Sequence, residues 1–361
     1  MQTLLALPSL SIRAMSCSMS SSATSVSKAV GVTASASAPT PWSDVAIKAA
    51  KDFTVSQRQK LSDLGALGVQ RPIQIIGTPI IDDDDDDDSS GIDTGTTTTT
   101  TVTKTIHFQR HGQGFHNLIC DVWREKGFPI DFDSSDPDLN PVIREEFLDP
   151  PLTETGRRQC KDRRMQCDAI HPPPELVIVS PLLRCIQTAK LSFVNHLPSS
   201  QSSQNDNDND NCTRSIRIPW VSHEGCREEL GLLVGNKRRP ISDITMDHPD
   251  IDFSAIDHDE DVLWDNYGTR RETLVEKSER IYDFLTTYVQ HRPEEHIAIV
   301  CHSAYLFTLL NAVMDIESED LRYWFLTSEV RSMNVTFQVN DAYEYTPEDG
   351  IDEKGDEKQE N

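Results

Sequence analysis

Five side chains of this sequence are of types that handle phosphate, and each follows a short apolar run in the chain. They are Arg110, His111, Arg184, His302 and a carboxylic acid among Glu224, Glu228 and Glu229. A neutral imidazole can attack phosphorus, forked guanidinium donors match phosphate oxygens, and a carboxylic acid can protonate a departing alkoxide. The set predicts phosphoryl transfer, provided that the fold brings the five side chains together.

The apolar runs that precede these side chains predict strands, and segments with apolar residues at helical spacing predict helices between them. The expected strands are 105–109, 176–180, 216–220, 297–301 and 334–339, and the expected helices are 154–170, 182–196, 271–289 and 304–313. Alternation of this kind predicts an α/β domain, a three-layer α/β/α sandwich with a mostly parallel central sheet. Ligands of such sheets bind beyond the carboxyl ends of the strands, where the five side chains would stand.

Four motifs in this region resemble those of the histidine phosphatase superfamily, in its phosphoglycerate mutase-like branch. In the order of that family they are RHGQGFHN at 110–117, LTETGRRQ at 152–159, SPLLRCIQTA at 180–189 and CHS at 301–303. The match spans roughly residues 104 to 340, and four motifs in order are far more specific than RHG alone. The resemblance implies the phosphoglycerate mutase-like fold.

The resemblance also implies a role for each matching residue. His111 would be the nucleophile that becomes phosphohistidine, and Arg110, Arg184 and His302 would bind the phosphoryl oxygens. Asn117 matches a position that also reaches the phosphate. No metal and no cofactor is implied for this chemistry.

The proton donor implied by the family maps to the segment that contains Cys226, Arg227 and Glu228. We choose Glu228, with Glu229 as the near competitor and Glu224 as a more distant one. Glutamate has an ordinary pKa of about 4.3, so an acid that works near neutral pH needs a raised pKa. Desolvation or a neighbouring negative charge would raise it.

Three departures from the family pattern bear on the activity. Gly114 stands where many members have Ser, Ser303 stands where many have Gly, and the ERxYG-like sequence that follows the acid in cofactor-dependent mutases is absent. The sequence therefore predicts a phosphatase that hydrolyses phosphate monoesters through phosphohistidine on His111. A phosphoglycerate mutase-type isomerase and a catalytically silent binding protein of the same fold are the alternatives.

Two further clusters have a functional and a plain interpretation. Lys237, Arg238 and Arg239 form a basic triplet that could hold a second anionic group of the substrate, with a solvated surface turn as the alternative. Glu329 and Arg331 could support the site, with a structural ion pair as the alternative. A separate set, His107, His111 and His116, has spacing that metal ligands can show, but carboxylates and thiols do not accompany it, and we predict no metal.

Composition limits the partners and the compartment. The formal net charge is −25 at pH 7, whereas nucleic acids and anionic membranes are bound through summed positive charge, so we expect neither partner. We expect a small phosphorylated substrate, held by local cations. The eight cysteines include no CxxC pair, which favours reduced thiols and an intracellular, cytoplasmic protein.

Composition also divides the chain. Residues 1–43 contain no Asp or Glu and predict a disordered leader or a transit peptide, which would direct the protein to a plastid or mitochondrion. Residues 44–103 form a variable segment and an Asp/Thr-rich linker. The catalytic domain is expected over 104–340, with a polar loop insertion at 199–211, and 341–361 as an acidic disordered tail.

Overall fold

A computed structural model describes residues 42–80, 101–196 and 218–343. The expected leader, Asp/Thr-rich tract, polar loop insertion and acidic tail lie wholly or mostly outside these residues. The six cysteines within the described ranges are buried and have free thiols. Among the helices of the same ranges, none combines the length and apolar character needed to cross a bilayer.

A seven-stranded sheet in the order β4-β3-β5-β2-β7-β1-β6 forms the centre of the described part. The strands are β1 (Ile73–Thr78), β2 (Val102–Arg110), β3 (Leu176–Val179), β4 (Trp220–Ser222), β5 (His296–Cys301), β6 (Asp315–Ile316) and β7 (Val330–Val339). The pairs β4–β3, β3–β5, β5–β2 and β1–β6 are parallel, and β7 runs antiparallel to both of its neighbours. The predicted α/β fold with a mostly parallel sheet is confirmed.

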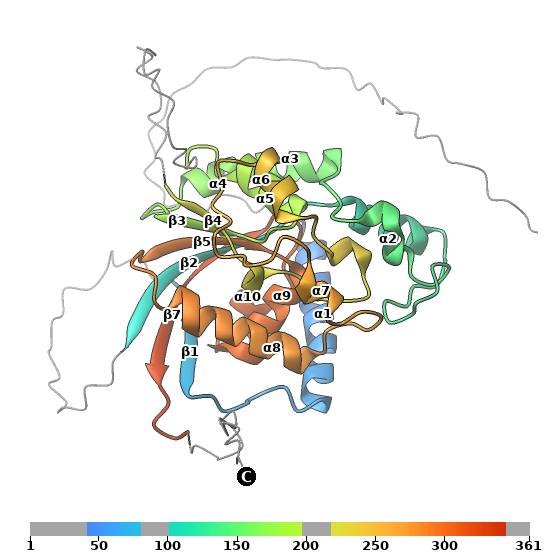
Figure 1. Cartoon of the computed structure of the whole chain (residues 1–361). Helices are drawn as coiled ribbons and strands as arrows, with labels where there is room; N and C mark the ends of the chain where they lie inside the picture. Colours follow the sequence, from blue (N-terminus) through green and yellow to red (C-terminus); the bar gives the residue numbers. More distant parts are fainter. Residues whose placement is uncertain (1–41, 81–100, 197–217, 344–361) are drawn as a thin grey trace, which may run out of the picture. The chain divides into compact units, whose positions relative to one another are not determined.

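Helices cover both faces of the sheet, because alternate residues of the buried strands point in opposite directions. Leu176 and Ile178 of β3 pack in one core with α8 (Leu274–Asp283) and α9 (Ser303–Thr308). Val177 and Val179 of the same strand pack in the other core with α5 (Leu183–Ser192) and α6 (Ile241–Asp247). Figure 1 shows these two pairs of helices on opposite sides of the strands, which gives the predicted three layers.

The remaining helical segments are short. They are α2 (Phe115–Glu125), α3 (Glu154–Asp162), α4 (Arg164–Asp168), α7 (Val262–Asp265) and α10 (Glu319–Arg322), with 3-10 turns η1 (Pro141–Ile143), η2 (Glu145–Phe147), η3 (Glu224–Cys226) and η4 (Val234–Asn236). Two longer predicted helices each end in a π-helical segment, since α8 continues into η5 (Phe284–Val289) and α9 into η6 (Leu309–Val313). The expected helix 154–170 is divided into α3 and α4.

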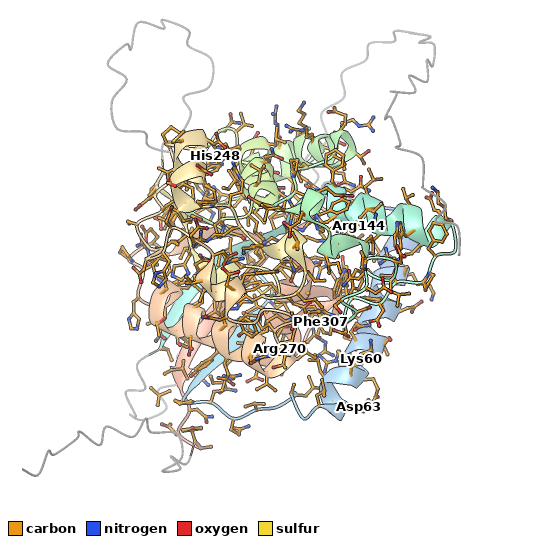
Figure 2. The ribbon with its side chains drawn as sticks, turned by 45° about the vertical axis from the view of Figure 1, so that its right-hand side comes forward. Lys60, Asp63, Arg144, His248, Arg270 and Phe307 are labelled. Carbon is orange, nitrogen blue, oxygen red and sulfur yellow. The ribbon has the colours of Figure 1, made fainter. Side chains whose placement is uncertain are left out.

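Two elements precede residue 104, where the sequence led us to expect the domain to begin. Strand β1 lies between β7 and β6, and the helix α1 (Asp44–Asp63) packs Leu61 against Phe307 of α9. Figure 2 shows Lys60 and Asp63 near the end of α1, with Phe307 beside the helix. The sequence analysis assigned residues 44–103 to a variable segment and a linker and predicted no strand there, because the polar tract that follows β1 separates it from the motifs.

Strand β4 also differs from its expected position. The sequence predicts a strand over 216–220, whereas the ladder with β3 begins at Trp220 and continues to Ser222. Pro219 precedes this ladder and has no N–H to donate, although its carbonyl accepts a hydrogen bond from the Val177 N–H. The paired segment therefore starts after the proline.

The position of β1 predicts that a chain starting at residue 101 is much less stable than one starting at residue 42. The shorter chain lacks the side chains of Leu61 and Ile75, which are 0% and 1% exposed. Burial of each is worth roughly 1.5–3 kcal/mol, so the free energy of unfolding should fall by about 3 kcal/mol or more. Urea unfolding of the two chains measures the difference, and equal midpoints would show that α1 and β1 are dispensable.

Candidate active site

The carboxyl ends of β2 and β5 bring two of the predicted histidines together. Arg110 pairs with Cys301 at the ends of these parallel strands, and the His111 N–H donates to the Cys301 carbonyl at 3.0 Å. His111 directly follows Arg110, and His302 directly follows Cys301, so the two histidines are placed side by side. The ring centroids of His111 and His302 lie 5.1 Å apart.

A backbone hydrogen bond fixes the tautomer of His111. Its Nδ1 lies 2.6 Å from the carbonyl oxygen of Gly112, and because a carbonyl can only accept, Nδ1 carries the proton. The lone pair is then on Nε2. Burial, followed by the charges of Arg184 and Arg110, lowers the pKa of His111 well below its ordinary value. The ring is neutral at pH 7 and can act as a nucleophile.

The LTETG motif holds the loop that carries His111. A Cβ on Gly112 would lie 2.6 Å from the carbonyl oxygen of Gly156, so two backbones meet there and a side chain has no room. Gly112 N–H donates to Thr188 Oγ1 at 3.0 Å. Two residues of this motif bind the backbone of Gln113. Its N–H donates to Gln159 Oε1 at 2.9 Å, and its carbonyl accepts from the Thr153 N–H at 2.9 Å.

Two arginines supply the positive charge of the site. Arg184 is fully buried and donates to the carbonyl of Gly235 at 2.7 Å and to Asn236 Oδ1 at 3.0 Å. Arg110 donates to the Phe325 carbonyl at 2.7 Å, and burial lowers its pKa to about 10, so it remains charged. Within the described residues, the Nε atoms of both guanidiniums are buried and have no hydrogen-bond partner.

Glu228 has the environment that a proton donor requires. Burial and then the charge of Glu229 raise its pKa above the ordinary value. Its carboxyl oxygens accept hydrogen bonds from the N–H groups of Ala304 and Tyr305 at 3.2 and 3.1 Å, at the start of α9. Because His302 directly precedes α9, these bonds place Glu228 next to the histidine pair.

The two competing glutamates are engaged in ion pairs. Burial alone would raise the pKa of Glu229, but the charges of Lys277 and Arg271 lower it to about 2. Lys277 Nζ lies 2.7 Å from one carboxylate oxygen, and Arg271 binds the other. Glu224 pairs with Arg227 and Arg238. The pKa of Glu228 is thus raised, whereas that of Glu229 is lowered.

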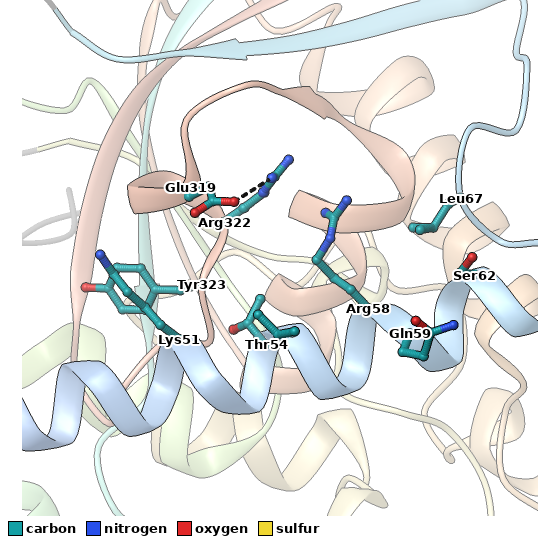
Figure 3. A pocket seen from close by; sticks show the side chains of 10 residues that line it. Lys51, Thr54, Arg58, Gln59, Ser62, Leu67, Glu319, Arg322 and Tyr323 are labelled. Carbon is teal, nitrogen blue, oxygen red and sulfur yellow. Dashed lines mark hydrogen bonds and ion pairs between the residues drawn. The ribbon is translucent and has the colours of Figure 1, made fainter.

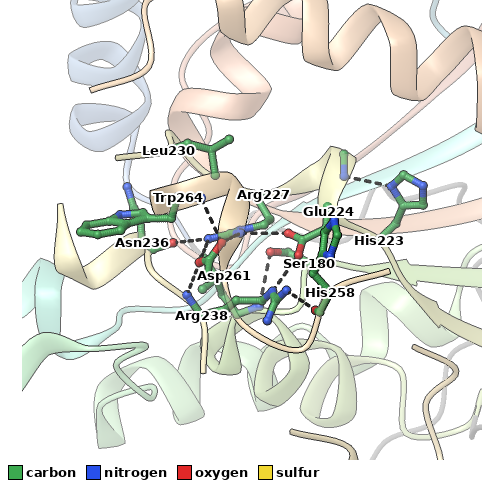
Figure 4. Close-up of polar contacts among 12 residues, drawn as sticks. Ser180, His223, Glu224, Arg227, Leu230, Asn236, Arg238, His258, Asp261 and Trp264 are labelled. Carbon is green, nitrogen blue, oxygen red and sulfur yellow. Dashed lines mark hydrogen bonds and ion pairs between the residues drawn. The ribbon is translucent and has the colours of Figure 1, made fainter. Parts of the chain in front are cut away.

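A buried ion-pair network fixes the segment on which Glu228 stands (Figure 4). Arg227 is fully buried and lies 2.6 Å from Asp261 and 2.9 Å from Glu224. Arg238 donates to Glu224 at 2.7 Å and to Asp261 through its backbone N–H at 2.8 Å. Because four charges interlock around Arg227, the neighbouring Glu228 has a defined position.

The same contacts show how the basic triplet is used. Lys237 pairs with Asp265 at 2.6 Å, and Arg239 lies 2.9 Å from Asp247. Arg238, only 2% exposed, is bound within the network described above. All three cations are thus engaged by carboxylates of the domain, an arrangement that fits a structural role better than the predicted second anion site.

Two side chains of the SPLLRC motif contact His302. Its Nε2 lies 2.8 Å from Ser180 Oγ, at the end of β3, and 3.4 Å from Cys185 Sγ. The side chain is fully buried, and burial followed by the charge of Arg184 lowers its pKa well below the ordinary value. A second neutral imidazole therefore lies beside His111.

Asn117 and Glu329 lie at the margins of the site. The Asn117 Oδ1 accepts from the Gly114 N–H at 3.0 Å and caps α2, so the hydrogen-bond donor of this side chain is Nδ2. The Glu329 carbonyl accepts from the Arg110 N–H at 3.1 Å, and its carboxylate pairs with Arg331 at 2.8 Å. Glu329 thus contacts the end of β2 through its carbonyl and forms with Arg331 the ion pair that the sequence analysis gave as the alternative.

His116 is a residue of the site that the sequence analysis considered only as a metal ligand. Its ring centroid lies 5.4 Å from that of His111, whereas His107 contacts Ser332 Oγ at 2.7 Å on β7. The described ranges hold no group of three or more His, Cys, Asp or Glu side chains placed to bind a metal ion. The spacing on the first turn of α2 was the available signal for His116.

A pocket of about 330 Å³ lies away from these residues, between α1 and the segment around α10 (Figure 3). Its polar lining includes Lys51, Arg58, Glu319, Arg322 and Tyr323. Arg58 donates to Asn311 at 2.7 Å, which attaches α1 to the α9 layer. The pocket shares no lining residue with the candidate site.

Comparisons with known proteins agree with the family resemblance that the four sequence motifs indicate. The family model described as the histidine phosphatase superfamily, branch 1, matches residues 143–199. The chain is 34% identical over 245 residues to "Phosphoglycerate mutase-like protein 1" of Arabidopsis thaliana, covering 64% of this chain and 80% of that protein. It is 32% identical over 251 residues to "Phosphoglycerate mutase-like protein" of the same plant, covering 66% and 86%.

A solved structure, the alpha-ribazole phosphatase from Shigella flexneri, aligns with 63% of this chain and 89% of its own at 17% identity and a TM-score of 0.36. The family assignment rests on the sequence relatives, most of whose length this chain covers. The chain belongs to branch 1 of the histidine phosphatase superfamily and is similar to its phosphoglycerate mutase-like proteins.

Proposed function

We propose that this protein is a metal-independent phosphatase that hydrolyses small phosphate monoesters through a phosphohistidine on His111. One observation carries the proposal: His111 is a neutral imidazole with its lone pair on Nε2, beside the buried Arg184, the half-buried Arg110 and a glutamate with a raised pKa. This combination provides nucleophile, charge stabilisation and proton donor in one place.

In the first step, His111 Nε2 attacks phosphorus and the ester P–O bond breaks as the N–P bond forms. Glu228 gives its proton to the departing alkoxide, which leaves as an alcohol. Arg110 and Arg184 stabilise the negative charge on the phosphoryl oxygens, and the His302 ring contacts the same group. The Gly112 carbonyl accepts the hydrogen bond of His111 Nδ1 and stabilises the charge that forms on the ring.

In the second step, the Glu228 carboxylate takes a proton from water, and the water oxygen attacks phosphorus. The N–P bond breaks, His111 recovers its lone pair, and inorganic phosphate leaves. Glu228 is protonated again at the end, so the cycle closes without a metal or a redox cofactor. One residue serves as acid and then as base, because the two steps are mirror images of each other.

Hydrolysis is favoured over isomerisation by the state of the basic triplet. A mutase must hold a second anionic group while its substrate is turned, and the cations at 237–239 are engaged by Asp265, Glu224 and Asp247. A phosphatase needs only to admit water. Because the Arabidopsis relatives carry the name phosphoglycerate mutase-like, isomerisation of 3-phosphoglycerate belongs in the same assay.

Replacement of the nucleophile tests the proposal most directly. We expect His111→Ala to lower kcat for p-nitrophenyl phosphate and for a panel of phosphate esters by about 10³-fold or more, because the covalent route is lost. The intact chain should take up label from a ³²P ester in an acid-labile form, and the variant should not. The exposed His258→Ala variant serves as the control.

Three results would contradict this assignment. His111→Ala with unchanged turnover would remove the nucleophile. Isomerisation of 3-phosphoglycerate faster than hydrolysis, with a bisphosphate primer, would indicate a mutase. Absence of both turnover and labelling in the intact chain would indicate a silent binding protein.

The raised pKa of Glu228 predicts a pH limb. Glu228 must be protonated in the first step, so kcat/KM for an alkyl phosphate should fall as pH rises through that raised pKa. The lowered pKa of His111 places the acidic limb well below the ordinary imidazole range. Glu228→Gln should remove the upper limb and lower kcat by about 10²- to 10⁴-fold.

A neighbouring substitution offers a matched control for this pH effect. The charge of Glu229 raises the pKa of Glu228, and Lys277 lowers it. Glu229→Gln removes the raising charge and leaves the lowering one, so the upper limb should move to lower pH. An unmoved limb in Glu229→Gln, or a persistent limb in Glu228→Gln, would assign the titration to another group.

A further inference from the structure

His116 lies against the nucleophile without any role in the chemistry described above. It stands in the first turn of α2, and its ring is tilted by 54° from that of His111 at a centroid distance of 5.4 Å. His302 lies at almost the same distance, 5.1 Å. The nucleophile therefore has two imidazole neighbours.

The Nδ1 atom of His116 is buried, and within the described residues it has no hydrogen-bond partner. A buried polar atom without a partner is costly, and at a ligand site the missing partner is commonly the ligand. Burial, then Arg184, His111 and Arg110, lowers the pKa of His116 well below its ordinary value. The ring is neutral at pH 7 and has one N–H to donate.

Gly114 gives independent support, because its lack of a side chain makes room for this ring. A Cβ at Gly114 would lie 2.6 Å from His116 Cε1 and 2.7 Å from Nδ1, closer than real contacts allow. The φ angle of Gly114 is −92°, which any residue can adopt, so space and not backbone freedom accounts for the glycine. Gly114, a departure from the Ser of many family members, is thus coupled to His116.

We propose that His116 is a further phosphoryl-binding residue of this site, which donates a hydrogen bond from its neutral ring to an oxygen of the phosphoryl group held at His111. The proposal rests on the proposed function, since it adds a ligand to the same phosphoryl site. The rings of His116 and His302 lie 5.4 and 5.1 Å from that of His111, and the charge of Arg184 lowers the pKa of all three. An oxyanion at that charge would meet the His116 ring.

Binding of orthovanadate and inorganic phosphate to the full chain tests this assignment by calorimetry. His116→Phe keeps a ring of similar shape without a donor, and should weaken both ligands by about 10- to 100-fold. His116→Asn keeps a donor and should recover most of the affinity. His107→Phe is the control, because His107 is a buried histidine of β2 outside the site, and it should leave both affinities unchanged. Urea unfolding confirms that each variant is folded.

A second pair of variants tests the coupling to Gly114. Gly114→Ala should weaken vanadate binding in the intact chain, because the added Cβ displaces the His116 ring. The same change in a His116→Ala background should alter the affinity by less than about twofold, since the displaced group is gone. Additive effects of the two substitutions would contradict the steric explanation.

The outcomes separate this proposal from the proposed hydrolysis. If His116→Phe binds vanadate as tightly as the intact chain, or if Phe and Asn weaken it equally, His116 only packs, whatever the chain hydrolyses. If His116→Phe weakens vanadate while the intact chain turns over no ester, His116 is a ligand of a silent site and the phosphatase proposal fails.

Discussion

The hydrogen bond from His111 Nδ1 to the Gly112 carbonyl determines which ring nitrogen carries the lone pair, and contacts of Gly112 with two other motifs hold the loop in which this bond forms. The carbonyl is aimed correctly because the Gly112 N–H is held by Thr188 and because the backbone of Gly156 passes too closely for a side chain at residue 112. The LTETG and SPLLRC motifs are thus structural supports for a single tautomer. Both motifs contact Gly112, just beyond the carboxyl end of β2.

Charge at the site is arranged so that cations and neutral rings share one buried volume. Arg184 has no exposed surface, and its positive charge disfavours protonation of every imidazole near it. Under the proposed function, a phosphoryl group would meet fixed positive charge and unprotonated nitrogen at the same time. The N-terminus of α9 binds the oxygens of Glu228. Burial and the charge of Glu229 raise the pKa of Glu228, although the charges of Lys277 and Arg184 oppose them.

The sequence predicted the parts of the fold and site that follow from local pattern. Strand ends are visible as apolar runs, and parallel strands bring their ends to one edge, so His111 and His302 could be placed together. Strand β1 was missed because its pairing with β7 joins segments separated by most of the chain. The difference between Glu228 and Glu229 was also out of reach, since it depends on Lys277 and Arg271, which approach from a distant helix and loop.

The ion pairs around Arg227 engage cations of the chain with carboxylates of the same domain. Buried ion pairs contribute little net stability compared with apolar packing, but a charge left without its partner is costly, so such networks define position. Glu224, Asp261 and Asp265 engage Arg227, Arg238 and Lys237 and thereby hold the segment that carries Glu228. These cations are thus paired with carboxylates of the domain. Under the proposed function, selection among phosphate esters would then depend mainly on the shape of the site and on the hydrogen bonds offered by side chains such as His116 and Asn117.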